Sequence, residues 1–196
     1  AVYDYLLESD SGPAVRSVST TFLIDRIAEA NGEDVVEVPV GFKWVAKGMG
    51  DSEALMGGEE SGGFSIRGHI REKDGVLMAL VAGAVTAAEP LDDRVDRLLE
   101  EHGEIHASKR SVACPDDEKE RVLDDLEAHI PESVAGSAVA NTVTLDGFKL
   151  LLEDGSWLLI RPSGTEPKLR VYGEAGSEDR LETLLEEGVD LVEPLV

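Results

Sequence analysis

Hydrophobic positions in the first part of the chain follow strand and helix patterns in turn. Short apolar segments at 14–19 and 35–40 are typical of strands, whereas residues 20–30 place their apolar side chains at helical spacing and end at an Asn-Gly pair. Strands that alternate with helices predict an α/β fold. We therefore expect residues 1–88 to form a three-layer α/β/α domain with a mostly parallel sheet.

The longest apolar run extends from Val76 to Ala88 and is rich in alanine and glycine. Asp74 precedes it and can cap a helix. The run is shorter than the roughly 18 residues that a membrane-spanning helix needs, so we expect no membrane partner. The pattern instead predicts a helix packed inside the first domain, which ends where Glu89 and Pro90 interrupt it.

Residues 89–103 contain an amphipathic segment, and we predict a linker helix there between two domains. The rest, residues 104–196, has several adjacent strand patterns, with an Asp154-Gly155 hairpin signal among them. Strands with helices segregated from them predict an α+β two-layer domain with a mainly antiparallel sheet. Its expected strands lie at 104–114, 138–145, 147–152, 156–160 and 169–174, and its expected helices at 116–130 and 177–192.

The chain has 196 residues and a formal net charge of −23, with carboxylates spread along its whole length. A negative field of this size repels nucleic acid and anionic lipid, so we expect neither as a partner. Dispersed carboxylates with few lysines predict a protein from a halophile, since salt screens the self-repulsion. An acidic protein from an ordinary environment is the alternative.

The cysteine and histidine residues indicate no metal centre. Cys114 is the one cysteine, so it has no partner for an internal disulfide, and we interpret it as a small apolar residue of a strand in a cytoplasmic protein. His102, His106 and His129 lack the spacing of metal ligands, so we expect them to be structural.

The segment between the strands at 156–160 and 169–174 carries groups that hold anions. Arg161 supplies a planar charged fork, and Ser163 and Thr165 supply hydroxyl donors. Gly164 can take backbone angles closed to other residues, so that successive N–H groups converge on an anion. The pattern predicts a phosphate-binding tip, with an ordinary polar turn as the alternative.

A second loop, at 57–63, is rich in glycine and has carboxylates at its centre. Carboxylates repel phosphate, but Glu59 can accept hydrogen bonds from sugar hydroxyls, and Ser61 can donate or accept them. A common acidic turn is the alternative.

Three segments resemble motifs of the α-D-phosphohexomutases, the phosphoglucomutase/phosphomannomutase family. Residues 161–167, Arg-Pro-Ser-Gly-Thr-Glu-Pro, resemble the R-x-S-G-T-E-P phosphate loop of the last domain. Residues 58–62 resemble the G-E-x-S-G sugar loop of the third domain, and residues 41–44 resemble the G-x-K-x segment before it. The motifs occur in the family's order, and the resemblance covers essentially the whole chain.

The resemblance implies roles for the matching residues. The sugar contacts would be Glu59 and Ser61, and the phosphate contacts would be Arg161, Ser163, Gly164 and Thr165. Lys168 is a further candidate for the phosphate, whereas Arg170 could be structural.

Lys43 is a candidate for sugar contact or proton transfer, although a lysine acts as an acid or base near neutral pH only where burial or nearby cations favour its neutral form. An ordinary surface lysine is the alternative. Arg67, His69 and Arg71 could face the substrate or form a solvated basic loop.

The family's phosphoserine loop and its D-x-D-x-D loop for Mg²⁺ belong to earlier domains, and neither motif occurs here. We therefore expect the C-terminal half of an enzyme that interconverts hexose 1-phosphate and hexose 6-phosphate, inactive without its N-terminal domains. The parent would use Mg²⁺ and act on a hexose phosphate, with glucose favoured over mannose or glucosamine. A non-catalytic phosphosugar-binding or anion-binding module of two domains is the alternative.

Overall fold

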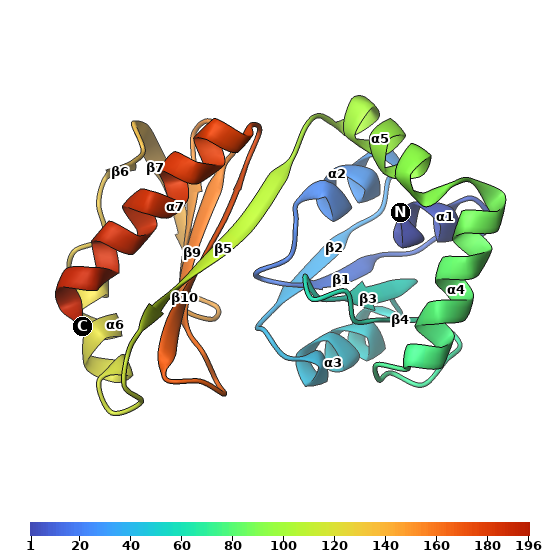
Figure 1. Ribbon diagram of the computed structural model, residues 1–196. Coiled ribbons are helices and arrows are strands. Elements are labelled where there is room, and N and C mark those ends of the chain that lie inside the picture. The colour runs from blue at the N-terminus through green and yellow to red at the C-terminus, as the bar shows by residue number, and fades with distance from the viewer. The chain divides into compact units, whose positions relative to one another are not determined.

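The computed structural model describes residues 1–196 and divides the chain into two compact units, Ala1–Gly103 (unit 1) and Glu104–Val196 (unit 2). Figure 1 labels their helices and strands. Each unit has its own sheet and its own core.

Unit 1 is built on a four-stranded sheet with the order β2-β1-β3-β4. Its strands are β1 (Ala14–Ser17), β2 (Val35–Val38), β3 (Met56–Gly58) and β4 (Phe64–Ile66). β1 runs parallel to β2 and β3, while β4 returns antiparallel to β3. The predicted mostly parallel sheet is therefore confirmed, and the carboxyl ends of β1, β2 and β3 share one edge.

Helices cover both faces of this sheet, as the three-layer prediction requires. They are α1 (Val2–Leu7), α2 (Leu23–Ala30), α3 (Phe42–Ser52), α4 (Gly75–Ala88) and α5 (Leu91–His102). α3 packs Val45 and Met49 against Val15 and Val38 on one face. On the other face, Ile27 of α2 and Leu98 of α5 share a core with residues of α1 and α4.

Residues 89–103, expected as a linker helix, pack within unit 1 because α5 carries both an apolar and a charged anchor. Leu98 is fully buried in the core that α2 shares. Arg94, 2% exposed, binds Asp4 of α1 at 2.5 Å and Glu8 at 2.7 Å. The division between the units consequently falls between Gly103 and Glu104.

Helix α4 begins as predicted but is not packed inside the unit. Asp74 accepts the N–H groups of Val76 at 2.9 Å and Leu77 at 3.2 Å, which confirms its capping role. However, Val76 is 72% exposed and Leu80 is 68% exposed, so the predicted interior position is wrong. No single helix is long and apolar enough to cross a membrane; α4 and α5 meet that test only as a pair bent by 75°.

Unit 2 is a six-stranded, wholly antiparallel sheet with the order β5-β10-β9-β8-β7-β6. Two helices and a final 3₁₀ turn accompany it, and the α7 side chains Leu184 and Leu185 pack on Leu158 and Val171 of the sheet. The predicted α+β architecture is confirmed, although the short β6 was not anticipated. The elements are β5 (His106–Ala113), α6 (Lys119–Glu127), β6 (Ser133–Val134), β7 (Ser137–Val143), β8 (Phe148–Leu152), β9 (Trp157–Pro162), β10 (Lys168–Ala175), α7 (Glu178–Val192) and η1 (Glu193–Leu195).

Candidate functional site

The β9–β10 connection of unit 2, residues 163–167, forms a tip that begins at a buried arginine. Arg161 is 8% exposed, and its Nε donates to Asp146 Oδ2 at 3.0 Å. Asp146 belongs to the turn before β8, where Gly147 has a φ of +82°. A Cβ on Gly147 would lie 2.3 Å from the Ile160 carbonyl oxygen, so only glycine lets this turn approach β9. The turn therefore holds the Arg161 guanidinium in place.

Lys119 of α6 fixes the backbone of the tip. Its Nζ donates to the carbonyl oxygens of Ser163 and Glu166, both at 2.7 Å. The N–H of Ser163 donates to the Lys168 carbonyl at 2.9 Å, but the N–H groups of Gly164 and Glu166 have no acceptor in the chain. Lys119 thus holds two carbonyl oxygens of the tip, while two of its N–H groups could bind an anion.

Gly164 does not have the special backbone conformation that the sequence analysis expected. Its φ does not lie in the left-handed region, so special backbone angles are not the reason for a glycine here. A Cβ built on Gly164 would meet no atom within 4 Å. The structure of this chain therefore gives no steric reason for a glycine at position 164.

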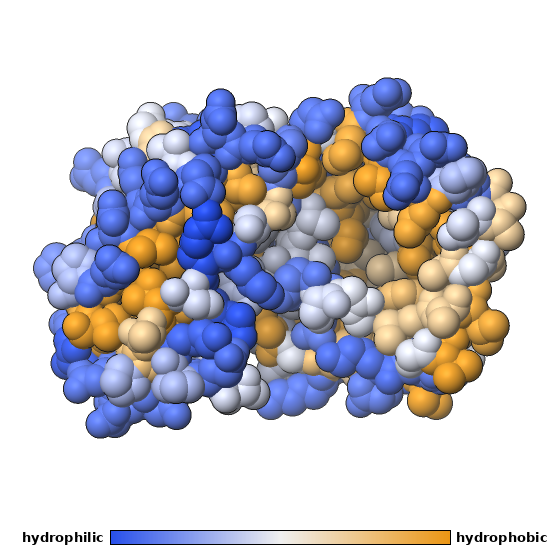
Figure 2. All heavy atoms as spheres, in the orientation of Figure 1, coloured by the Kyte–Doolittle hydropathy of each residue, from blue (hydrophilic) through white to orange (hydrophobic).

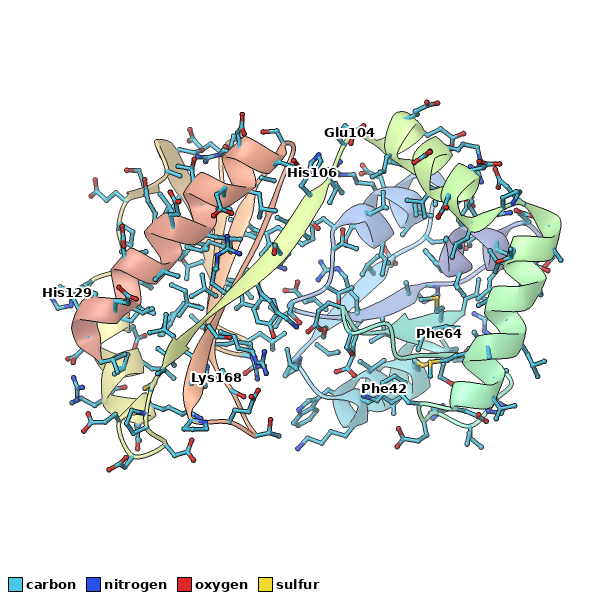
Figure 3. The ribbon with its side chains drawn as sticks, in the orientation of Figure 1. Phe42, Phe64, Glu104, His106, His129 and Lys168 are labelled. Carbon is cyan, nitrogen blue, oxygen red and sulfur yellow. The ribbon has the colours of Figure 1, made fainter.

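Three cations lie on one face of the sheet beside this tip. Arg161 and Arg170 are direct cross-strand partners, and Lys168 lies two residues before Arg170 at the start of β10 (Figure 3). Like charges directly opposite each other destabilise a sheet, and here each cation has a carboxylate partner. Asp146 binds Arg161 at 3.0 Å, whereas Glu166 binds Lys168 Nζ at 2.7 Å and also Arg170. The hydrogen bond from Lys168 lowers the pKa of Glu166.

The loop at 59–63 of unit 1 follows β3 at the carboxyl edge of the sheet. The Glu59 side chain, 6% exposed, accepts the Gly41 N–H at 3.0 Å on one oxygen and Lys73 Nζ at 3.0 Å on the other. Glu60 accepts the Ser19 hydroxyl at 3.0 Å. The two glutamates thus join loops that follow β1, β2 and β3, at the edge where open α/β sheets bind ligands.

The loop keeps unused capacity to accept hydrogen bonds. Each Glu59 oxygen has two lone pairs, and one hydrogen bond to each leaves one per oxygen for a hydroxyl group. Ser61 is exposed and can donate or accept. Figure 3 labels Phe42 and Phe64, which directly follow Gly41 and this loop. The arrangement suits a polyhydroxylated ligand better than an anionic one.

Lys43 and Lys73 make different contacts in unit 1. Lys43 is exposed in the first turn of α3, with its Nζ 5.2 Å from the centre of the Trp44 ring. Within this chain Lys43 is therefore not buried. Lys73, by contrast, contacts Glu59 directly. Lys73 lies 14 residues after Glu59, and this separation matches no motif that would predict the contact. The only signal in the sequence was that Lys73 belongs to a basic loop.

Arg67, His69 and Arg71 lie away from the sugar loop, because β4 carries the chain back along β3. The Arg67 N–H donates to the Leu55 carbonyl at 2.9 Å, and its guanidinium donates to the Glu53 carbonyl at 2.6 Å. The three basic residues line a separate cavity of about 590 Å³. The structure therefore does not bring them to Glu59 and Ser61.

His106 and His129 make contacts within unit 2. His106 Nε2 lies 3.8 Å from Glu104 Oε2, and His129 Nδ1 lies 2.7 Å from the Asp125 carbonyl oxygen (Figure 3). Cys114 is fully buried, and burial raises the pKa of its thiol. No three His, Cys, Asp or Glu side chains of the chain cluster where they could hold a metal ion.

Comparison with known families covers nearly the whole chain. Residues 1–102 match the family pattern described as phosphoglucomutase/phosphomannomutase, alpha/beta/alpha domain III. Residues 111–191 match the pattern described as the C-terminal domain of the same family. The two matches fall on unit 1 and unit 2.

Individual relatives agree with this assignment. A probable phosphoglucosamine mutase of Methanothermobacter thermautotrophicus is 34% identical over 86% of the chain and 36% of its own length. A phosphopentomutase of Thermococcus kodakarensis is 31% identical over 98% of the chain and 41% of its own length. A Thermus thermophilus protein, provisionally assigned as a phosphomannomutase, has a crystal structure that matches with a TM-score of 0.74 at 30% identity, over 98% of the chain and 40% of its own. The chain thus spans about two fifths of the length of these relatives.

Proposed function

The chain belongs to the phosphoglucomutase/phosphomannomutase family, and we propose that it is the substrate-binding part of a phosphohexomutase. The whole enzyme would interconvert hexose 1-phosphate and hexose 6-phosphate. Unit 2 would hold the phosphate that is not being transferred, and unit 1 would hold the hydroxyl groups of the hexose.

The observation that carries the proposal is the composition of the unit 2 tip. The tip has three positive charges, those of Arg161, Arg170 and Lys168. In addition, the amides of Gly164 and Glu166 have no acceptor in the chain. Ser163 and Thr165 add hydroxyl groups. A phosphate dianion would satisfy all these donors together, and Glu166 already shows that the cations accept an anionic partner.

The unit 1 loop supports the sugar half of the proposal. Glu59 is fixed by Gly41 and Lys73, so its remaining lone pairs point in set directions. Ser61 would bond a second hydroxyl of the same ring, and Lys43 would contact the ligand from the start of α3. Carboxylates that are held in advance accept neutral hydroxyls without a large reorganisation cost.

The residues of this chain bind and orient the substrate in this proposal; they do not transfer the phosphoryl group. The nucleophile and the Mg²⁺ ligands would belong to the preceding domains of the whole protein, where the metal would stabilise the charge on the transferring group. The chain alone would then be inactive. Among the possible sugars we propose glucose, on the Glu-Glu-Ser form of the loop at 59–61.

The test compares this chain with the whole protein, using glucose 1-phosphate, mannose 1-phosphate and glucosamine 1-phosphate. We expect turnover by the whole protein alone, with the highest kcat/KM for glucose 1-phosphate. In the whole protein, Arg161→Ala should raise KM about tenfold or more. Arg121→Ala removes a surface arginine that pairs with Glu118 and Asp125, and it should leave KM unchanged.

Turnover by the 196-residue chain alone would contradict the division of roles. Binding of hexose phosphate without turnover by the whole protein would support the alternative, a non-catalytic phosphosugar-binding module. An unchanged KM in Arg161→Ala would remove the unit 2 tip from the substrate site.

A further inference from the structure

Lys119 is a buried cation at an unfavourable position of its own helix. It is the first residue of α6, where the helix dipole favours negative rather than positive side chains. Its side chain is only 12% exposed, although lysine is rarely buried in proteins. The stability of α6 therefore does not account for this lysine, and its contacts outside the helix are the alternative explanation.

The ammonium group of Lys119 uses all three of its protons. Nζ donates to Asp116 Oδ1 at 2.6 Å and to the carbonyl oxygens of Ser163 and Glu166 at 2.7 Å each. A lysine ammonium has three donors and no acceptor, so these contacts satisfy it completely. Asp116 balances its charge, and the other two contacts join α6 to the tip.

The contact with the Ser163 carbonyl also determines where the Gly164 N–H points. The two groups belong to one peptide, and the chain has no cis peptide bond. In a planar trans peptide, the C=O and N–H bonds point in opposite directions. Because Lys119 holds the carbonyl, the Gly164 N–H points away from Lys119, and no group of the chain accepts it.

Lys119 also affects the strength of this donor. A hydrogen bond to a carbonyl oxygen polarises the peptide, and a charged donor polarises it more than a neutral one. The effect falls on a single amide of the tip. The Ser163 carbonyl shares its peptide with the Gly164 N–H, whereas the Glu166 carbonyl precedes Pro167, which has no N–H.

Other contacts fasten the two ends of the tip to the strands. The Ser163 N–H donates to the Lys168 carbonyl at 2.9 Å, and the Pro167 carbonyl accepts the Cys114 N–H at 3.0 Å. Figure 2 shows mainly hydrophilic atoms around the place where Figure 3 labels Lys168, the residue after the tip. Loss of the Lys119 contacts would therefore free the orientation of one amide without detaching the tip from the sheet.

We propose that Lys119 is a positioning residue for phosphate binding and acts through the Ser163–Gly164 peptide. It fixes the direction of the Gly164 N–H and makes this group a stronger donor. Lys119 does not itself bind the phosphate, since its three protons are in use. The inference rests on the proposed function, because it takes the tip as the phosphate site.

The experiment measures the phosphate affinity and the amide shifts of the 196-residue chain, with inorganic phosphate as the probe. Lys119→Met removes the three donors and keeps a similar apolar stem. Lys119→Arg keeps a cation that has donors for both carbonyls. Arg121→Met is the matched control, because it removes one positive charge from the same helix, where Arg121 pairs with Glu118 and Asp125.

We expect Lys119→Met to weaken the binding of inorganic phosphate by about three- to tenfold in Kd. The amide nitrogen shift of Gly164 should change in the free variant, because this atom shares its peptide with the Ser163 carbonyl. Lys119→Arg should recover most of the lost affinity, and Arg121→Met should lose none. In the unmodified chain, phosphate should move the amide proton of Gly164 further than that of Thr165, whose N–H already has Ser163 Oγ at 3.5 Å.

Three results would overturn the inference. The first is an unchanged Kd in Lys119→Met while Arg161→Ala still weakens binding, and this result would leave the proposed function standing. The second is an equal loss in Lys119→Met and Arg121→Met, which would assign the effect to net charge. The third is a Gly164 amide that phosphate does not move in the unmodified chain. This last measurement needs no variant, so it decides the matter if Lys119→Met does not fold. A chain that binds no phosphate at all would contradict the proposed function as well.

Discussion

The two candidate loops are built on opposite charges and share one principle. In unit 2 the groups offered to a ligand are cations, and carboxylates hold them: Asp146 binds Arg161, and Glu166 binds Lys168 and Arg170. In unit 1 the offered group is a carboxylate, Glu59, and a cation holds it. Each loop thus keeps its charge in place with an internal counter-ion. A ligand must compete with that counter-ion in unit 2 but needs only unused lone pairs in unit 1.

The largest expected effect concerns the turn that supports Arg161. Gly147→Ala should destabilise the protein by about 3 kcal/mol or more, since the φ is unfavourable and the new Cβ meets the backbone of β9. Gly155→Ala is the control: its Asp-Gly turn has a φ of +84°, but a Cβ there meets nothing within 4 Å. Gly155→Ala should lower the free energy of unfolding by about 1–2 kcal/mol. Equal losses in urea unfolding would show that close packing on Arg161 is unimportant.

The next prediction separates the two loops by ligand. Arg161→Ala should weaken the binding of inorganic phosphate and of glucose 6-phosphate alike, by about 10- to 150-fold in Kd, because a charge-assisted hydrogen bond is lost. Glu59→Gln should weaken the binding of the sugar phosphate only, since inorganic phosphate has no ring hydroxyls. Calorimetric titration of the whole protein measures both. A loss of inorganic phosphate binding in Glu59→Gln would remove the distinction between the loops.

A smaller effect should follow from the internal anion of unit 2. Glu166→Gln removes the negative charge that pairs with Lys168 and Arg170. Phosphate should then bind about two- to tenfold more tightly at low ionic strength, because it no longer competes with that carboxylate. Asp117→Asn, an exposed acidic change in the same unit, controls for net charge. Equal gains in both variants would assign the effect to the net charge of the chain rather than to Glu166.

The smallest effect is a pH dependence. Because Lys168 lowers the pKa of Glu166, this carboxylate stabilises the fold above its unfolded pKa, and the contribution is lost as the pH falls through the lowered folded value. The Tm of the unmodified chain should therefore fall more steeply in acid than that of Glu166→Gln. Parallel curves in the acid range would indicate that the ion pairs of Glu166 contribute nothing measurable.

Local signals in the sequence were sufficient to predict most helices and strands of both units. Asp74 caps α4 as expected, and Asp154-Gly155 forms the β8–β9 turn. The two loops were also identified from their own residues. The contacts that support them were not, because Lys119 reaches the tip from 44 residues away and Lys73 reaches Glu59 from 14. Such pairings depend on topology rather than on spacing.

Helix α4 shows a different limit of sequence patterns. Its apolar residues occur on all sides, and this pattern predicts a buried helix without saying what buries it. The structure shows that unit 1 covers only one side. Gly164 shows a related limit, since its identity suggested a special backbone angle that the structure does not contain.

The central claim, that the unit 2 tip binds phosphate while the unit 1 loop binds sugar hydroxyls, is tested most directly by amide chemical shifts of the 196-residue chain. Inorganic phosphate should shift the amides of Gly164, Thr165 and Glu166 and leave those of residues 59–63 in place. Glucose 1-phosphate should shift both sets. The account would be contradicted if phosphate left the amides of 164–166 unchanged while it shifted those beside Arg67 and Arg71.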